Sequence, residues 1–388
     1  MNNVELRVYD QELTPLGVID EIASLLWTPT YWNEGTVGDI KLLAPMSENN
    51  KRLLTKGNIM VLHDGTADYT NEVGTWRRGT QIRYRRITKD TEGAEQIEVQ
   101  GHFLKKWLSK RVMINKIAMT GTEQEKINRI VAENCGTDAE TKRQFKQFII
   151  LAQEDLGGSS TEYSNKDFAD VGKEIYDRAV VGKLGYDILI NENTRQYGFW
   201  LYKGRDLTSG NGEWNTPAVF SREFDNVNEQ EYTESDEGSR NVMYATGAAN
   251  DNGVTPLVEI DNGGTGIDRN EVYVDMSSIS RKYTKDKVEV TITEAEYLKM
   301  LAAAAGDGLE DYGETVAFTS NINIASKLKY GKDFYLGDRI TCIEKNWGIR
   351  MDARITAVCF TYQNGKKEIE ATLGESLPTL LQQIRKVR

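Results

Sequence analysis

The hydrophobic and polar positions of the first hundred residues alternate in short runs that are typical of β-strands. We predict strands over residues 4–9, 23–32, 39–43, 58–63, 80–89 and 95–101. Their lengths and spacing fit an antiparallel barrel or sandwich. The sequence therefore predicts an all-β first domain.

The apolar spacing changes to a helical one after about residue 112. Thr122 and Glu125 form a capping box, and the apolar residues that follow recur every three or four positions until Gly136. Ser164 and Asp167 are predicted to open a second helix, whose apolar face would hold Phe168, Val171 and Ile175. A hairpin over residues 186–202, turning at Glu192-Asn193, completes a predicted α/β domain with few strands.

The last part of the chain is predicted to be mainly strands with one inserted helix. Strands resume at residues 218–224 and 241–247, and Thr293 with Glu296 opens a helix that Gly306 is predicted to end. Strands then continue over residues 319–373, with the hairpin signal Asn364-Gly365 between two extended runs. We predict a final helix over residues 378–388.

Two parts of the chain share one order of features: a glycine entry, a strand, a crossing strand with Arg-Ile-Thr, and a closing strand that ends in glycine. The runs are 56–61, 82–88 and 97–101 in the first part, and 336–341, 354–358 and 369–374 in the second. A duplicated β-barrel would explain this order. The alternative is that short strands with glycine turns resemble one another by chance. A duplication predicts equivalent places in their sheets for residues 58–61 and 339–342.

These patterns predict a mixed, β-rich α+β chain with two similar antiparallel β-barrel domains and small α/β insert domains. The predicted divisions are a first barrel (1–112), an α/β domain (113–212), a second barrel in two parts (213–258 and 317–375), an inserted α/β domain (259–316) and a C-terminal tail (376–388). A chain of 388 residues is long enough for several such domains.

Charge and composition exclude several classes of protein. The chain has 48 Lys and Arg against 59 Asp and Glu, a formal net charge of −11, which argues against binding nucleic acid by bulk charge. Its first ten residues lack the apolar run of a secretory signal, and its longest aliphatic stretch, 148–152, is far shorter than the roughly 18 residues of a membrane span. We expect a soluble protein made in the cytoplasm.

The residue types that most often carry chemistry are scarce. Three separated cysteines, Cys135, Cys342 and Cys359, predict neither a disulfide framework nor a zinc site. Two histidines, His63 and His102, end predicted strands, where we expect surface side chains. Cys342 and Cys359 are expected to be small core residues, and no Gly-x-Ser-x-Gly motif is present.

Two further patterns could indicate a calcium site or a catalytic site, but each has a simpler structural interpretation. Residues 263–268 match the start of a calcium-binding nonapeptide, but the motif occurs once, so a flexible loop is the preferred interpretation. Acidic residues cluster at 229–237 and 307–314. They could include the paired carboxylates of a glycosidase, but solvated acidic loops are the preferred interpretation. The sequence therefore predicts no catalytic, cofactor-binding or metal-binding residue, no cofactor, and no enzyme.

Basic residues cluster at 77–78, 83–89 and 105–111 of this acidic chain. Strand alternation places Arg83 and Arg85 on one face of the run 82–88, and Tyr84 and Arg86 on the other. A solvated or partner-facing sheet surface is the plain interpretation. A lumen lining that meets passing DNA is the minor alternative.

Several runs resemble the tail-hub proteins of long non-contractile-tailed phages and prophages. The runs 217–227 and 330–338 carry most of the resemblance, with Tyr232, Asn241-Val242, Arg354-Ile355-Thr356 and residues 373–378. Residues 27–32 with 35–43 are similar to the opening of that family, and 199–208 to its middle hairpin. The resemblance covers most of the chain.

The resemblance implies a homotrimer at the virion tail tip that closes the distal end of the tail tube. Two similar barrels per chain would form a pseudo-sixfold ring against the distal tail (adaptor ring) protein. The tape-measure protein and receptor-binding or fibre proteins are the other implied partners, and DNA would only pass through. We expect the basic runs to offset repulsion between copies, against acidic residues such as 229–237, so that assembly depends on salt.

Two rival functions stay open. Many relatives continue into a peptidoglycan hydrolase and are called tail-associated lysins, but this chain stops at Arg388, so we do not expect lytic activity. A carbohydrate-binding module that recognises the host surface is the second rival, because tyrosine and tryptophan stack on sugars. Those aromatic residues also fit burial in strands and interfaces.

Overall fold

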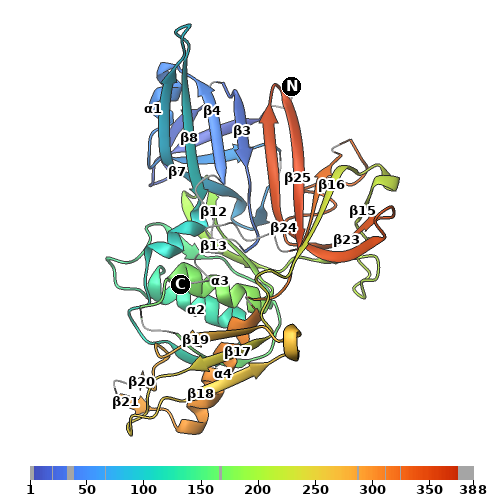
Figure 1. The fold of residues 1–388 in the computed structure, drawn as a ribbon. Coiled ribbons are helices and arrows are strands. Elements are labelled where there is room, and N and C mark those ends of the chain that lie inside the picture. The colour runs from blue at the N-terminus through green and yellow to red at the C-terminus, as the bar shows by residue number, and fades with distance from the viewer. Residues whose placement is uncertain are drawn as a thin grey trace.

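The computed structural model describes residues 4–19, 21–32, 39–65, 67–165, 168–285, 288–310, 312–323 and 325–374. Strands outnumber helices, which confirms the β-rich α+β class. Figure 1 shows two sheets side by side, one blue and one red, above a layer that contains α2 and α3 and a further layer with α4. Among the described residues, no helix is both long and apolar enough to cross a membrane.

The first sheet has the strand order β2-β1-β5-β7-β8-β4-β3, with antiparallel neighbours throughout. A short hairpin strand, β6, pairs with the start of β7, and helix α1 connects β4 to β5. The bounds are β1 Glu5–Tyr9, β2 Pro15–Val18, β3 Ser24–Trp27, β4 Ile40–Pro45, α1 Glu48–Leu53, β5 Ile59–His63, β6 Tyr69–Asn71, β7 Gly74–Lys89 and β8 Glu95–Phe103.

The second sheet has the order β16-β22-β25-β24-β23, and β14 and β15 pair in parallel with β23. The β24–β25 hairpin turns at Asn364-Gly365, as predicted, and both residues have the positive φ (53° and 72°) that this tight turn requires. The bounds are β14 Asp206–Leu207, β15 Val219–Ser221, the 3-10 turn η2 Arg222–Phe224, β16 Val227–Ser235, β22 Thr315–Ile322, β23 Arg339–Glu344, β24 Ile349–Gln363 and β25 Lys366–Gly374.

Five strands of each sheet repeat the same order and hydrogen-bond register, β5-β7-β8-β4-β3 in the first and β23-β24-β25-β22-β16 in the second. The strands beyond them differ, because β1 pairs antiparallel with β5 and β14 and β15 pair in parallel with β23. β5 pairs with the first half of β7, and β23 pairs with the first half of β24. The Ile82 amide donates to the Asn58 carbonyl, and the Ile355 amide donates to the Asp338 carbonyl, each at 2.9 Å. A β-bulge follows each isoleucine. Residues 59–62 and 339–342 therefore occupy equivalent places. The duplication is supported, but the predicted match of 58–61 with 339–342 is one residue out of register.

Two further details of the predicted repeat differ in the structure. The Arg-Ile-Thr runs do not correspond: Ile82 is equivalent to Ile355, whereas Ile87 lies five residues further along β7. Strand alternation alone leaves the register open, and the pairing with the preceding strand and the bulge decide it. Moreover, no closed barrel is found among the described strands. The β3–β24 pairing joins the two sheets, the β12–β7 pairing adds β10, β12 and β13, and together these strands form one 18-stranded sheet.

An α/β layer connects the two sheets. Helices α2 and α3 pack together over the β12–β13 hairpin, and every residue of β12 is buried. Strand β10 extends β13 in parallel, and β9 pairs with β11. The bounds are the 3-10 segment η1 Leu104–Lys110, β9 Ala118–Gly121, α2 Glu123–Asn134, β10 Phe148–Ile150, β11 Thr161–Ser164, α3 Val171–Gly182, β12 Gly185–Asn191 and β13 Gln196–Tyr202.

A third layer follows β16 in the sequence. Helix α4 covers a three-stranded sheet of order β18-β17-β19, so β17 pairs within this layer and not with β16 or β22. The bounds are β17 Val242–Thr246, β18 Leu257–Asp261, the 3-10 turn η3 Gly266–Asp268, β19 Glu271–Asp275, β20 Lys282–Lys285, β21 Val288–Thr291 and α4 Glu294–Glu310. The predicted domain boundaries stay predictions. The predicted tail and helix at 376–388, and Gly35, lie outside the described residues.

Helix boundaries depend on caps and burial. The predicted Thr122 capping box is present at α2. Helix α3 begins at Val171, later than predicted, because the Asp170 side chain caps it. Gly306 does not end α4, which continues to Glu310 because Leu309 is still buried against the three-stranded sheet.

Candidate functional site at the junction of the two sheets

The two related sheets meet where β3 pairs antiparallel with the second half of β24. Trp27 lies opposite Phe360, and a single bridge continues the pairing between Thr30 and Ala357. The Tyr31 amide donates to the Thr356 carbonyl at 2.8 Å. The first sheet thus passes into the second by backbone hydrogen bonds, which fix the register between them.

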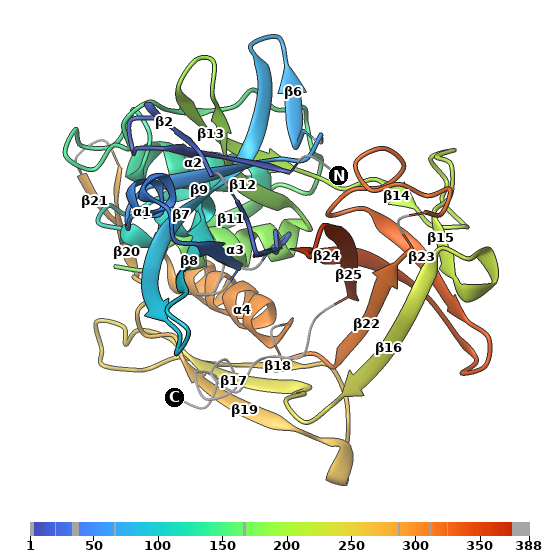
Figure 2. The ribbon, with the colours of Figure 1, turned by 90° about the horizontal axis from the view of Figure 1, so that it is seen from above.

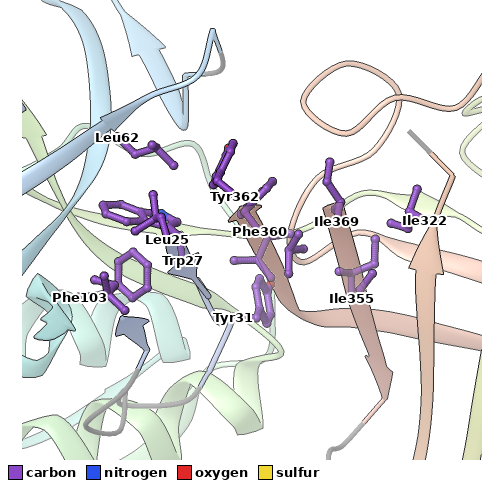
Figure 3. Close-up of a cluster of buried hydrophobic side chains, with 14 of the residues drawn as sticks. Leu25, Trp27, Tyr31, Leu62, Phe103, Ile322, Ile355, Phe360, Tyr362 and Ile369 are labelled. Atoms are coloured by element: carbon purple, nitrogen blue, oxygen red, sulfur yellow. The ribbon is translucent and has the colours of Figure 1, made fainter. Parts of the chain in front are cut away.

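Apolar side chains from both sheets fill the junction, as Figure 3 shows. Leu25 and Trp27 of β3 and Phe360 of β24 are buried in one continuous core. The Trp27 and Phe103 rings pack edge to face, with centroids 5.3 Å apart. Full burial of one such side chain contributes about 1.5–3 kcal/mol, so this core holds the two sheets together strongly.

Tyr31 lies at the point where both sheets and the α/β layer meet. It is fully buried, and its hydroxyl donates to the Lys183 carbonyl at 3.0 Å. The Arg354 guanidinium lies 5.0 Å from the centroid of its ring. Glycines make room for the ring, since a Cβ at Gly185 or Gly337 would approach it to 2.2 or 2.4 Å. Tyr31 therefore helps to set the relative orientation of the three parts.

A buried lysine supports the same junction from η1. Lys105 is 2% exposed, and its ammonium group donates to the Thr30 carbonyl. Burial lowers the pKa of Lys105 to about 8. The ammonium also lies 5.3 Å from the centroid of the Tyr186 ring in β12. Lys105 thus connects the junction strand to the α/β layer.

A buried arginine joins the first sheet to the β12–β13 hairpin. Arg78 of β7 binds the Asp187 carboxylate at 2.6 Å, the Asp68 carboxylate, and the Tyr202 hydroxyl at 3.2 Å. Burial opposes the charge of Arg78, but Asp68 and Asp187 outweigh it and keep its pKa well above the usual value. Because removal of one partner would leave a buried charge, this group is a structural connection.

His63 is not the surface histidine that the sequence predicts. Its side chain is 17% exposed, and its Nε2 lies 2.9 Å from the Glu192 carboxylate in the β12–β13 turn. The Tyr9 hydroxyl donates to the same carboxylate. Burial would raise the pKa of Glu192, but the hydrogen bonds from His63 and Tyr9 outweigh burial and lower it. His102 is half-buried in β8.

The cysteines do not form a reactive group. Cys135 and Cys342 are buried, and Cys359 is half-buried. Burial raises the pKa of the Cys135 thiol to about 12 and also raises that of Cys342. Both thiols are therefore protonated at neutral pH, which makes them weak nucleophiles.

The acidic and glycine-rich runs have specific places in the fold. Most of the run 229–237 is strand and not loop, because Glu229, Glu231 and Glu234 belong to β16, and only Asp236 and Glu237 lie in the turn that follows. Asp307 lies on α4, where it binds Arg178 at 2.9 Å. Residues 266–268 form the turn η3. Within the described ranges, no three His, Cys, Asp or Glu side chains lie together as a metal site would need.

Three solved structures share this fold. The tail protein from Neisseria meningitidis MC58 aligns with a TM-score of 0.54 and 12% identity, over 96% of this chain and 97% of that one. The 43 kDa tail protein of prophage MuSo2 from Shewanella oneidensis gives 0.54 and 11%, over 95% and 98%. Prophage tail protein gp18 from Listeria monocytogenes EGD-e gives 0.50 and 13%, over 99% and 98%. At these identities the similarity concerns the fold alone.

Sequence comparison identifies the family directly. No protein with a curated description is significantly similar to this chain. The family profile described as "Siphovirus ReqiPepy6 Gp37-like protein" matches residues 5–375, nearly the whole chain. The resemblance to tail proteins of long-tailed phages and prophages is thereby confirmed. The chain belongs to the siphovirus ReqiPepy6 Gp37-like family of phage tail proteins.

Proposed function

We propose that this tail protein is a structural hub at the virion tail tip: a homotrimer that closes the distal end of the tail tube. It would join the sixfold distal tail protein to the tape-measure protein and to host-binding parts. One observation carries this proposal: a single chain contains two sheets that share a five-strand order and register and are joined by the β3–β24 pairing.

The internal repeat supports the trimer by stoichiometry. A tail tube is a stack of sixfold rings, and a cap with one tube-facing sheet per chain would need six copies to match it. Two equivalent sheets in one chain meet the same need with three copies, since a ring of three chains then presents six similar surfaces. In this ring the sheets that are open in the single chain would complete barrel-like walls.

Copy number in purified tail particles tests this proposal. Quantitative mass spectrometry of intact tails measures the molar ratio of this chain to the distal tail protein. The proposal predicts one hub chain for every two subunits of a sixfold distal ring. A ratio of one to one, or of one to six, contradicts it.

We also propose that the chain has no cell-wall hydrolase activity. The proposal rests on where the groups that could carry hydrolase chemistry lie in the fold. The His63–Glu192 pair and the Arg78 cluster are structural connections, and two of the three thiols are buried. The test is the turbidity of purified peptidoglycan with the chain and with a heat-denatured control. Clearing above the control that a single carboxylate or histidine substitution abolishes would contradict the proposal.

A further inference from the structure

The structure carries a specific prediction of how one copy contacts the next. We infer that the open edge of β7, at residues 84–89, pairs antiparallel with the open edge of β16, at residues 229–235, of a second copy of this chain. The pairing would repeat, between chains, the β3–β24 junction that exists within one chain. This inference rests on the proposed trimer and adds its interface.

The equivalence of strands follows from the repeated register. In the first sheet, Trp27 pairs with Ile40, Ile40 pairs with Gly101, and Gly101 pairs with Ile82. In the second sheet, Tyr232 pairs with Phe318, Phe318 pairs with Leu373, and Leu373 pairs with Ile355. Since the bulges after Ile82 and Ile355 also correspond, β16 is the equivalent of β3, and β7 is the equivalent of β24.

The inferred edges of β7 and β16 lack a strand partner within the described part of the chain. Residues 84–89 of β7 pair with β8 on one side only, whereas the equivalent residues of β24 have β25 on one side and β3 or the Thr30 bridge on the other. Strand β16 pairs with β22 only, whereas β3 pairs with both β4 and β24. Open edges of this length favour pairing with another chain.

The register of the new pairing can be read from the existing one. Phe360 lies opposite Trp27, so the equivalent residue Ile87 is placed opposite Tyr232. Ile87 is 48% exposed, whereas its equivalent Phe360 is 5% exposed in the junction core. The same register places Thr88 opposite Glu231. The exposure of Ile87 thus marks the position where β7 lacks the cover that β3 gives to β24.

Opposite charges on the two edges favour the pairing of β7 with β16. Residues 83–89 contain four basic side chains and no acidic one, and β16 contains three glutamates and no basic residue. The register sets Arg85 opposite Glu234, where opposite charges on one sheet face attract. Arg85 binds only the Lys51 carbonyl among the described residues, so its charge has no carboxylate partner there. Like edges would repel, which disfavours pairing of β7 with β7.

The positions of the two edges suit a closed ring. Figure 2 shows β7 and β8 on one side of β24 and β25, and β16 on the other side. An interface between opposite sides of a subunit is head-to-tail, and it forms a ring when the rotation closes. Because the contact between chains copies the contact within a chain, each step turns the sheet by the same angle.

Cysteine cross-linking of the full chain tests this register. Thr88→Cys and Glu231→Cys, combined in a Cys359→Ser background, place two exposed positions opposite each other, within the roughly 4.4–6.8 Å between Cα atoms that a disulfide spans. The matched control combines Thr88→Cys with Glu234→Cys, which lies three residues, or about 10 Å, along β16. Both designs remove one glutamate. We expect covalent dimers and trimers on oxidation at high protein concentration with the first pair, at least tenfold above the control.

The outcomes separate this inference from the proposed function. Trimers of the first design in native mass spectrometry without a disulfide between positions 88 and 231, or equal cross-linking in the control, overturn the β7–β16 interface and leave the trimeric hub standing. The absence of cross-linked species at any concentration also overturns the interface. A copy number other than three in intact tails overturns the hub itself, whatever the cross-linking shows.

Discussion

At the scale of single residues, the junction depends on small side chains beside large ones. Tyr31 reaches the centre of the molecule because Gly185 and Gly337 leave space for its ring. Tyr31, Gly185 and Gly337 are each more than 150 positions from the other two, so no local pattern in the sequence connects them. The aromatic run that contains Tyr31 is visible in the sequence, but its partners are not.

A methyl group at Gly337 should destabilise the junction. Gly337 has a φ of +96°, and the added Cβ of Gly337→Ala would lie 2.4 Å from the Tyr31 ring. Gly348→Ala is the matched control, because Gly348 also has a positive φ (+68°) but no atom within 4 Å of a Cβ. In chemical denaturation we expect a loss of about 1 kcal/mol for the control and about 1–3 kcal/mol more for Gly337→Ala. Equal losses would show that the space around Tyr31 does not matter.

The lowered pKa of Glu192 predicts a pH-dependent contribution to stability. A carboxylate whose folded pKa lies below its unfolded value stabilises the fold above the unfolded pKa, about 4.3, and that contribution is lost as the pH falls through the folded pKa. Glu192→Gln should therefore lower the free energy of unfolding by about 1 kcal/mol at pH 7, because it replaces a charged acceptor by a neutral one.

The measurement for Glu192 is urea denaturation at several pH values. We expect the difference between the native chain and Glu192→Gln to shrink toward zero near pH 3. The exposed pair of Glu12 with Lys146 offers a control, Glu12→Gln, for which we expect little change at either pH. A difference for Glu192→Gln that is constant with pH would contradict the assigned role.

At the scale of elements, local signals predicted the secondary structure well. The first-sheet strands, the capping box of α2 and the Asn364-Gly365 hairpin are present near the predicted positions. The errors lie where tertiary contacts outweigh local signals, as in the continuation of α4 past Gly306, which the burial of Leu309 explains. The β3–β24 junction could not be predicted, because its strands are more than 300 residues apart and each reads as an ordinary strand.

Charge reversal across the inferred β7–β16 interface should weaken association. Arg85→Glu or Glu234→Arg alone would set like charges opposite each other, and we expect a loss of about 1 kcal/mol per contact, roughly fivefold in affinity. The double variant should recover most of the native affinity. Sedimentation velocity at low and moderate salt measures this, with Lys142→Glu, an exposed site far from both strands in the sequence, as the control. Failure of the double variant to recover association would count against the pairing of Arg85 with Glu234.

At the scale of the whole molecule, the repeat is the property that leads from sequence to function. The order of glycines and strands indicated a duplication, and the register of β5 with β7 and of β23 with β24 agrees with it. The net charge of −11 opposes association of copies at long range, so close opposite charges are needed for assembly. We therefore expect assembly of purified chains to weaken as salt rises, and to strengthen when the distal tail protein is added.

The symmetry of the tail tip distinguishes a trimeric hub from a hexameric or a monomeric one. Electron cryo-microscopy of intact tails, reconstructed without imposed symmetry, would resolve the ring at the distal end of the tube. We expect three copies of this chain, with the first and second sheets alternating at six similar positions. Six copies of the chain in that ring, or a single copy, would contradict the trimeric hub.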